Sequence, residues 1–157
     1  MRGNTVQVFN PGPNQQHAIC LSISSDPLAV RNGLADLFDD YAMSCLSDDV
    51  RGTAEIVLAE VLNNIVEHAY ACYPGEIEIR VQIRAQDLQF NIIDAGLAMP
   101  DDQLPLGQLR DLCAADDLPE GGFGWFLIRT LSRDLSYVRS GRQNQLSFRL
   151  ETNQSSQ

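Results

Sequence analysis

Apolar and polar positions alternate most clearly between residues 77 and 84, where four aliphatic side chains are separated by charged or amide side chains. This period of two predicts a strand that buries one of its faces. Residues 17–24 alternate in the same way, and residues 88–94 form a further strand-like segment. Because only a short turn separates residues 77–84 from residues 88–94, we expect these two strands to form a hairpin.

Three other stretches have the pattern of helices. Asp26-Pro27 is typical of a helix start, and apolar residues then recur at helical spacing as far as Cys45. Ser47 is expected to cap a second helix that runs to about Tyr70. A third helix is expected over residues 121–132, where a glycine run leads into an apolar segment.

The remaining segments complete the expected fold. Residues 135–138 and 145–150 flank a Ser-Gly-Arg turn and predict a second hairpin, whereas the proline- and aspartate-rich residues 99–120 predict a long loop with at most a short helix near Leu109. The order of elements predicts an α+β fold, a two-layer sandwich with helices on one face of a mainly antiparallel mixed sheet. We expect one domain over residues 16–151, with an N-terminal arm (1–15) and a disordered tail (152–157).

Charge and composition exclude several functions. Acidic residues outnumber basic residues by 21 to 11, and the net charge of −10 opposes binding to nucleic acid or to an anionic membrane. The chain contains no lysine, which excludes a Walker-A phosphate loop, the usual protein-kinase signature and Schiff-base chemistry. Its cysteines form no CxxC pair, and no apolar run approaches the length of a membrane span, so we expect a cytoplasmic protein.

Two groups of polar residues are candidates for a binding site. Glu60, Asn64 and His68 fall on the polar side of the second helix, where Glu60 and Asn64 are one turn apart and can reach the same point. The alternative is a solvated helix face. Asp94 and Gly96 follow an apolar strand and could provide a buried acceptor for an exocyclic amine beside a close-approaching ring. The alternative is an ordinary turn.

A third candidate is the glycine run Gly121-Gly122-Phe123-Gly124, which opens the third helix. Backbone amides at such a helix start can point at an anion and are helped by the helix dipole. The alternative is a tight loop whose glycines serve only the backbone conformation. Because lysine is absent, phosphates bound here would need backbone amides, arginine and a divalent cation.

In this order, the three groups resemble the ATP-binding site of the GHKL superfamily, which includes histidine kinases, gyrase-type topoisomerases and MutL-type repair proteins. The closer resemblance is to the bacterial anti-sigma-factor serine kinases. It rests on EVLNNIVEHAY (residues 60–70), LPEGGFGWFLI (118–128) and the stretch from residue 134 to 146, and it extends from about residue 17 to 150.

The resemblance implies a GHKL (Bergerat) ATP-binding fold with ATP and Mg²⁺ as its ligands. Glu60 would be the general base, and Asn64 would bind magnesium and ATP. Asp94 would accept a hydrogen bond from the adenine amino group, with Gly96 and Ala98 beside the adenine. The glycine run would surround the phosphates, and residues 99–120 would form a lid.

Two departures from the family pattern concern the same region. Ala98 stands where the family often has a second glycine, and its methyl group would narrow the pocket or stiffen the lid hinge. The lid is strongly acidic and would oppose ATP unless its carboxylates point outward or metal is present. His68 matches the family sequence, but we expect only a packed or capping imidazole there.

We therefore expect an ATP-dependent serine/threonine kinase and anti-sigma regulator that acts on a small partner protein in a partner-switching pathway. The implied partners are an anti-sigma-antagonist-like protein, a sigma factor or both, with a homodimer left open. The alternative is a nucleotide-gated anti-sigma binding module without kinase turnover. A histidine-kinase ATP domain without its phosphoacceptor is a third interpretation, disfavoured because no helix-borne histidine precedes the glutamate helix.

Overall fold

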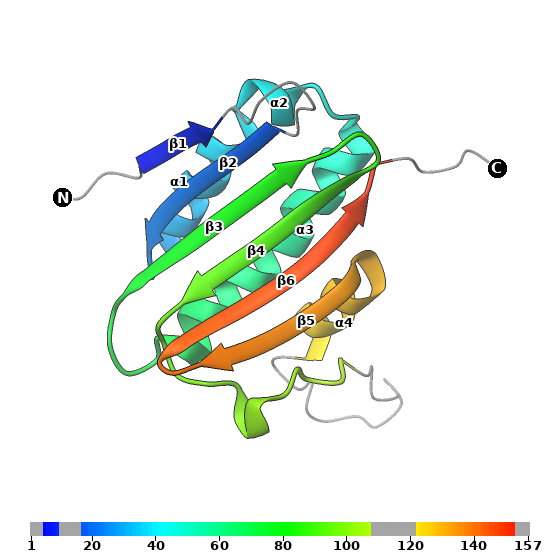
Figure 1. Cartoon of the computed structure of the whole chain (residues 1–157). Coiled ribbons are helices and arrows are strands. Elements are labelled where there is room, and N and C mark those ends of the chain that lie inside the picture. The colour runs from blue at the N-terminus through cyan, green and yellow to red at the C-terminus, as the bar shows by residue number, and fades with distance from the viewer. Residues whose placement is uncertain (1–4, 10–16, 108–121, 153–157) are drawn as a thin grey trace.

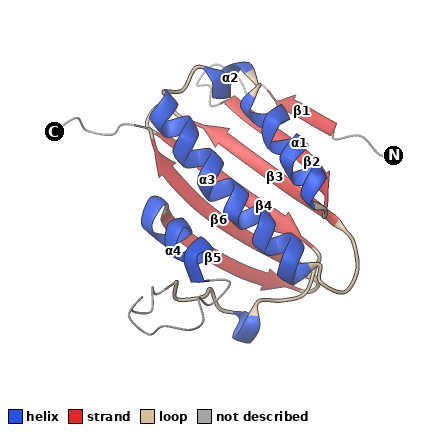
Figure 2. Cartoon of the chain, turned by 180° about the vertical axis from the view of Figure 1, so that it is seen from behind, coloured by secondary structure: helices blue, strands red, loops and turns tan. Residues whose placement is uncertain are grey.

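The computed structural model describes residues 5–9, 17–107 and 122–152 (Figure 1). They form two layers, a twisted six-stranded sheet and a set of helices that cover one of its faces (Figure 2). The strands in spatial order are β1 (Thr5–Phe9), β2 (His17–Ser24), β3 (Glu76–Ile83), β4 (Asp87–Asp94), β6 (Gln143–Glu151) and β5 (Arg133–Ser140). The expected α+β sandwich with helices on one face is confirmed.

Neighbouring strands pair in the antiparallel sense throughout the described part of the sheet, so no parallel pair of a mixed sheet occurs there. Both expected hairpins are present, β3 with β4 and β5 with β6. Strand β1 pairs with β2 at the edge of the sheet, which places Thr5–Phe9 of the expected N-terminal arm in the sheet. The expected tail, beyond residue 152, lies outside the described residues.

The expectation of one helix from Pro27 to Cys45 is wrong. Asp26 caps α1 (Pro27–Phe38) by accepting from the backbone N–H of Ala29, as expected, but α1 stops at Phe38. The side chain of Asp40 then accepts from a backbone N–H two residues on and starts a separate short helix, α2 (Tyr41–Ser44). An aspartate that offers its carboxylate to a nearby amide competes with helix continuation in this way.

The second expected helix is confirmed in its start and its length. Ser47 caps α3 (Asp48–Asn64), and the chain continues as a π turn, η1 (Ile65–Ala69), up to Tyr70. Helix α3 crosses the inner face of the sheet, and α4 (Gly122–Leu131) lies beside it (Figure 2). In the described residues, no helix combines the length and apolar character that crossing a membrane requires.

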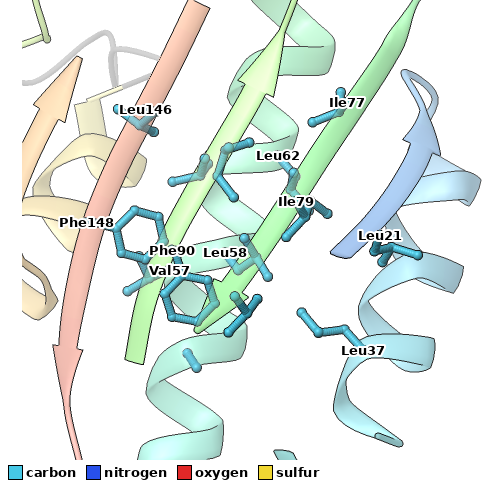
Figure 3. Packing of buried hydrophobic residues seen from close by; sticks show 14 of the residues in the cluster. Leu21, Leu37, Val57, Leu58, Leu62, Ile77, Ile79, Phe90, Leu146 and Phe148 are labelled. Carbon is cyan, nitrogen blue, oxygen red and sulfur yellow. The ribbon is translucent and has the colours of Figure 1, made fainter. Parts of the chain in front are cut away.

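The hydrophobic core lies between α3 and the central strands (Figure 3). The rings of Phe90 on β4 and Phe148 on β6 are stacked, with centroids 4.8 Å apart. Fully burying such a side chain contributes roughly 1.5–3 kcal/mol. One side of α3 is buried against the sheet, and this burial determines how the helix is turned about its own axis. The buried residues include Ala54, Val57, Leu58, Val61 and Leu62. With these residues on the sheet, the polar side of α3 lies away from the core.

Only the first part of the expected lid is described, up to Gly107. It contains a short 3-10 turn, η2 (Pro100–Asp102). Arg129 of α4 donates from Nε to the carbonyl oxygen of Pro105 (2.8 Å), and this attaches the segment to α4. The short helix expected near Leu109 falls outside the described residues.

Candidate functional site

A pocket opens at the end of the sheet where β4 finishes and β6 begins. Its walls come from the end of α3, η1, the segment after β4, α4, β5 and β6. Most of the wall is apolar, and a few polar side chains are set into it, namely Asn64, His68, Asp94, Tyr137 and Asn144. Ligand sites combine an apolar wall with a few fixed polar groups in this way.

Asp94 is the buried carboxylate of this pocket, and only 6% of its surface is exposed. Its Oδ1 accepts from the backbone N–H of Gly96 (2.8 Å) and from Nδ2 of Asn144 (2.8 Å). Within the described residues, its Oδ2 has no hydrogen-bond partner. Burial raises the pKa of Asp94 against the opposing effects of these two donors and of the Arg139 guanidinium. A buried carboxylate in a pocket, with one oxygen not engaged by the described residues, is typical of a functional site.

The segment after β4 is packed against the backbone of η1. The N–H of Leu97 donates to the carbonyl oxygen of Ala69 (2.7 Å), and a Cβ on Gly96 would lie 2.5 Å from that same oxygen. This approach by itself requires a glycine at position 96. Ala98 lines the pocket two residues further on.

Gly96→Ala is therefore expected to destabilise the protein by about 1–3 kcal/mol, the usual cost of overpacking, because backbone on both sides resists the added methyl group. Gly52→Ala is the matched control, since a Cβ there would meet nothing within 4 Å inside α3. That control should be neutral or stabilising by roughly 0.5–1 kcal/mol. Urea denaturation measures both variants, and equal midpoints would contradict the packing described.

Glu60 and Asn64 are half-buried and face the start of α4. A Cβ on Gly124 would lie 2.5 Å from Oε2 of Glu60 and 3.7 Å from Nδ2 of Asn64. In the described part of the chain, Nδ2 of Asn64 is buried and has no hydrogen-bond partner. The glutamate–asparagine face is therefore covered by the glycine-containing helix start and is not a fully solvated surface.

His68 lies in the π turn η1. A π turn is wider than an α turn, and such turns are frequent at functional sites. His68 is exposed and lines the pocket together with Asn64. Of the two roles expected for His68, a packed or a capping imidazole, the packed one is wrong, and the capping one stays a prediction.

Comparison with known proteins identifies the family. A family model described as "Histidine kinase-like ATPase domain" matches residues 23–150. The chain belongs to this family. Relatives of this histidine kinase-like ATPase domain include proteins named "Serine-protein kinase RsbW" from Bacillus thuringiensis (strain Al Hakam), Bacillus cereus (strain AH187) and Bacillus anthracis (strain A0248). Each is 32% identical over 93 residues, which span 58% of this chain and 58% of the relative.

The expected site residues of this ATPase domain fall into three groups. Asn64, Asp94 and Ala98 line one pocket. Gly124 lies close to both Glu60 and Asn64, so Glu60 is at the Asn64 end of this pocket. Gly96 lies in the segment after β4, at its close contact with the backbone of η1. Phe123 is 53% exposed, Gly122 is the first residue of α4, and Gly121 lies outside the described residues.

Sequence reasoning assigned no role to Asn144, Tyr137 or Arg139. The alternation along β6 could have indicated Asn144, because this residue lies on the buried side of the strand together with Leu146 and Phe148. A polar residue on an apolar strand face needs partners, and Asn144 finds them on two other strands. The hydroxyl of Tyr137 also accepts from the N–H of Met99 (3.1 Å), where the expected lid begins.

Proposed function

We propose that this domain binds ATP with magnesium and transfers the γ-phosphoryl group to a serine or threonine hydroxyl of a small partner protein. One observation carries the proposal. A single pocket is lined by both Asp94 and Asn64, and Glu60 and the start of α4 lie beside Asn64. A molecule with an amino-bearing base at one end and phosphates at the other fits this order of groups.

At the base end, Asp94 would accept a hydrogen bond from an exocyclic amino group. The apolar residues Leu97, Trp125 and Leu146 line the same pocket and would pack against a flat ring. Hydrogen bonding in a poorly solvated pocket discriminates strongly, because a mismatched ligand leaves buried polar groups unpaired. Adenine is the purine that offers an amino group where guanine has a carbonyl oxygen.

At the phosphate end, Asn64 fits the role of a magnesium ligand. The side-chain carbonyl oxygen would hold the ion, and the amide nitrogen, which is unpartnered among the described residues, would be left to donate to a phosphate oxygen. The described residues contain no group of three His, Cys, Asp or Glu side chains that could hold a metal by themselves. Magnesium usually keeps several waters and binds through one or two protein oxygens plus the ligand's phosphates. When bound, the ion would supply the positive charge that a chain without lysine lacks.

Asn64→Ala is expected to weaken ATP binding by as much as chelation of magnesium does, because both remove the bridge between protein and triphosphate. Asn64→Asp should be milder, since a carboxylate oxygen can still bind the ion. The matched control is Asn63→Ala, an exposed neighbour on the same helix. Calorimetric titration with and without EDTA measures the effect. If ATP affinity is the same with and without EDTA, Asn64 has a structural role.

For the transfer, Glu60 would take the proton of the attacking hydroxyl. The bond from phosphorus to the ADP oxygen breaks, the bond to the serine or threonine oxygen forms, and the hydroxyl proton passes to the Glu60 carboxylate. Positioning and electrostatic stabilisation supply most of the rate in such reactions. The packing of Glu60 against Gly124 supports this role, because the carboxylate lies beside the helix start that would face the phosphates.

The partner of this reaction is part of the proposal. The relatives named serine-protein kinase support a protein substrate, and the resemblance to anti-sigma-factor serine kinases favours an anti-sigma-antagonist-like protein, with a sigma factor as the inhibited target. Such a regulator would act in the cytoplasm without contacting nucleic acid itself. The test is ADP formation and phosphate transfer with a co-purifying partner. A stable, nucleotide-dependent complex with no ADP formed would favour the binding module instead.

A further inference from the structure

Asn144 is 4% exposed and lies at the base end of the pocket, opposite Asp94 in the β4–β6 register. Its amide nitrogen Nδ2 donates to Oδ1 of Asp94 (2.8 Å) and to the carbonyl oxygens of Leu97 (3.0 Å) and Gly96 (3.3 Å). An amide nitrogen carries two hydrogens, so these three acceptors use its full donor capacity.

The carbonyl side of the same amide is occupied as well. Oδ1 of Asn144 accepts from the hydroxyl of Tyr137 (2.7 Å) and from Nη1 of Arg139 (2.6 Å). The reversed amide would place an NH₂ group against the Arg139 guanidinium and an oxygen against Asp94. Only one orientation of Asn144 therefore satisfies its neighbours, and no polar group of its side chain is left for a ligand.

This arrangement decides how Asp94 can be used. A carboxylate with two free oxygens can accept a parallel pair of hydrogen bonds. Here the N–H of Gly96 and Nδ2 of Asn144 fill both acceptor positions of Oδ1, and Oδ2 is the only oxygen left. Asp94 can offer a ligand only this one oxygen and cannot accept a parallel pair of hydrogen bonds from two adjacent donors.

We infer that Asn144 is a specificity-determining residue that makes Asp94 a one-oxygen acceptor and so excludes guanine; this rests on the proposed function. Guanine can approach a carboxylate in two ways. In the adenine orientation it presents a carbonyl oxygen to Oδ2, and Asp94 alone rejects it. In a turned orientation it presents the adjacent donors N1–H and N2–H₂, which need both oxygens, and Asn144 blocks that approach.

Arg139 positions Asn144 in this scheme. Its Nη1 also donates to the carbonyl oxygen of Gly96 (3.1 Å), so one guanidinium is bonded to both the amide and the segment after β4. Among the described residues, Arg139 on β5 and Tyr70 at the end of η1 interact electrostatically with Asp94, and His68 and Tyr137 line the same pocket. Loss of the Asn144 donor removes an effect that lowers the pKa of Asp94, so that pKa should rise further.

The experiment compares ADP, GDP and IDP binding by calorimetry, at a pH well above the pKa of Asp94. In Asn144→Leu, the preference for ADP over GDP should shrink by ~10-fold or more, the effect of one hydrogen bond to a charged group. The affinity of Asn144→Leu for IDP, which lacks the N2 amino group, should rise less over the wild type than its affinity for GDP does. The control is Gln145→Leu, an exposed neighbour on the other face of β6, which should keep the wild-type preference.

Two further measurements keep the test decisive. Arg139→Gln alters a half-buried side chain and should also reduce the preference for ADP over GDP, but by less than Asn144→Leu does. This variant tests the inference if Asn144→Leu does not fold. Carbon-13 titration of the Asp94 carboxyl in the ligand-free protein should show a higher pKa in Asn144→Leu. Unchanged selectivity in the folded Asn144→Leu variant would overturn the inference alone. A wild type that binds no adenine nucleotide would overturn the proposed function and the inference together.

Discussion

Asp94→Ala is expected to abolish nucleotide binding and to leave the fold intact, and the wild type is expected to prefer ATP to GTP by ~10³-fold or more. The reason is the single free oxygen of a buried carboxylate. Asp94 is buried in a largely apolar pocket, where a ligand amino group that loses this acceptor gains little from solvent. The unpaired donor then costs its full desolvation free energy.

The fold should survive because Asp94 is not the only partner of its neighbours. Asn144 keeps its bonds to the carbonyl oxygens of Gly96 and Leu97, and the end of β4 keeps the hydroxyl of Tyr70, which accepts from the N–H of Ala95 (2.9 Å). Asp87→Ala at the other end of β4 is the matched control, since Asp87 pairs with arginines far from the pocket.

Calorimetry with ATP and GTP, together with circular dichroism of each variant, measures the prediction. Equal affinity of the wild type for the two nucleotides would remove Asp94 from the recognition of the base. ATP binding by a folded Asp94→Ala variant would do the same.

The features that the sequence predicted are those that local pattern determines. Alternation over residues 77–84 and the caps at Asp26 and Ser47 depend on neighbours within a few positions, and the structure confirms all three. Glu60 and Asn64 are candidates from the sequence because helical spacing places them one turn apart. Asp94 is a candidate because it ends an apolar strand.

The features that were missed have two causes. Some depend on contacts between distant segments, and others arise where a side chain accepts from a backbone N–H and so interrupts a helix. Asn144 reaches Asp94 only through the β4–β6 register, 50 positions apart in sequence, and reaches Arg139 only through the β5–β6 hairpin. The break before Asp40 reflects a side-chain cap that outcompetes the apolar spacing running through it. The π turn over Ile65–Ala69 has no helical-wheel signal, since a wheel assumes a constant 100° per residue.

Glu60→Gln is expected to slow phosphate transfer by ~10² to 10⁴-fold, the usual effect of losing a general base. ATP affinity should stay at the wild-type level or rise slightly. A carboxylate beside the phosphates repels them, and glutamine keeps the shape of glutamate without its charge. The partner protein should still be captured, because the variant changes one half-buried group in the pocket wall.

Gly124→Ala tests the same carboxylate from the opposite side. Its Cβ would lie 2.5 Å from Oε2 of Glu60, and the contact is to the end of a flexible side chain, so the carboxylate can move away at little cost in stability. Transfer should fall while the urea midpoint stays close to that of the wild type. Glu67→Gln is the control for both variants, because Glu67 is an exposed carboxylate on η1 that no proposed step uses.

The comparison of these variants separates catalysis from binding. If Glu60 is the base, Glu60→Gln loses transfer and keeps ATP, Gly124→Ala loses transfer, and Glu67→Gln loses neither transfer nor ATP. Wild-type transfer by a folded Glu60→Gln variant would show that another group accepts the proton. If the wild type transfers no phosphate to any co-purifying partner, while ATP still controls capture of that partner, Glu60 has no proton to accept. The domain then acts as a nucleotide-gated inhibitor.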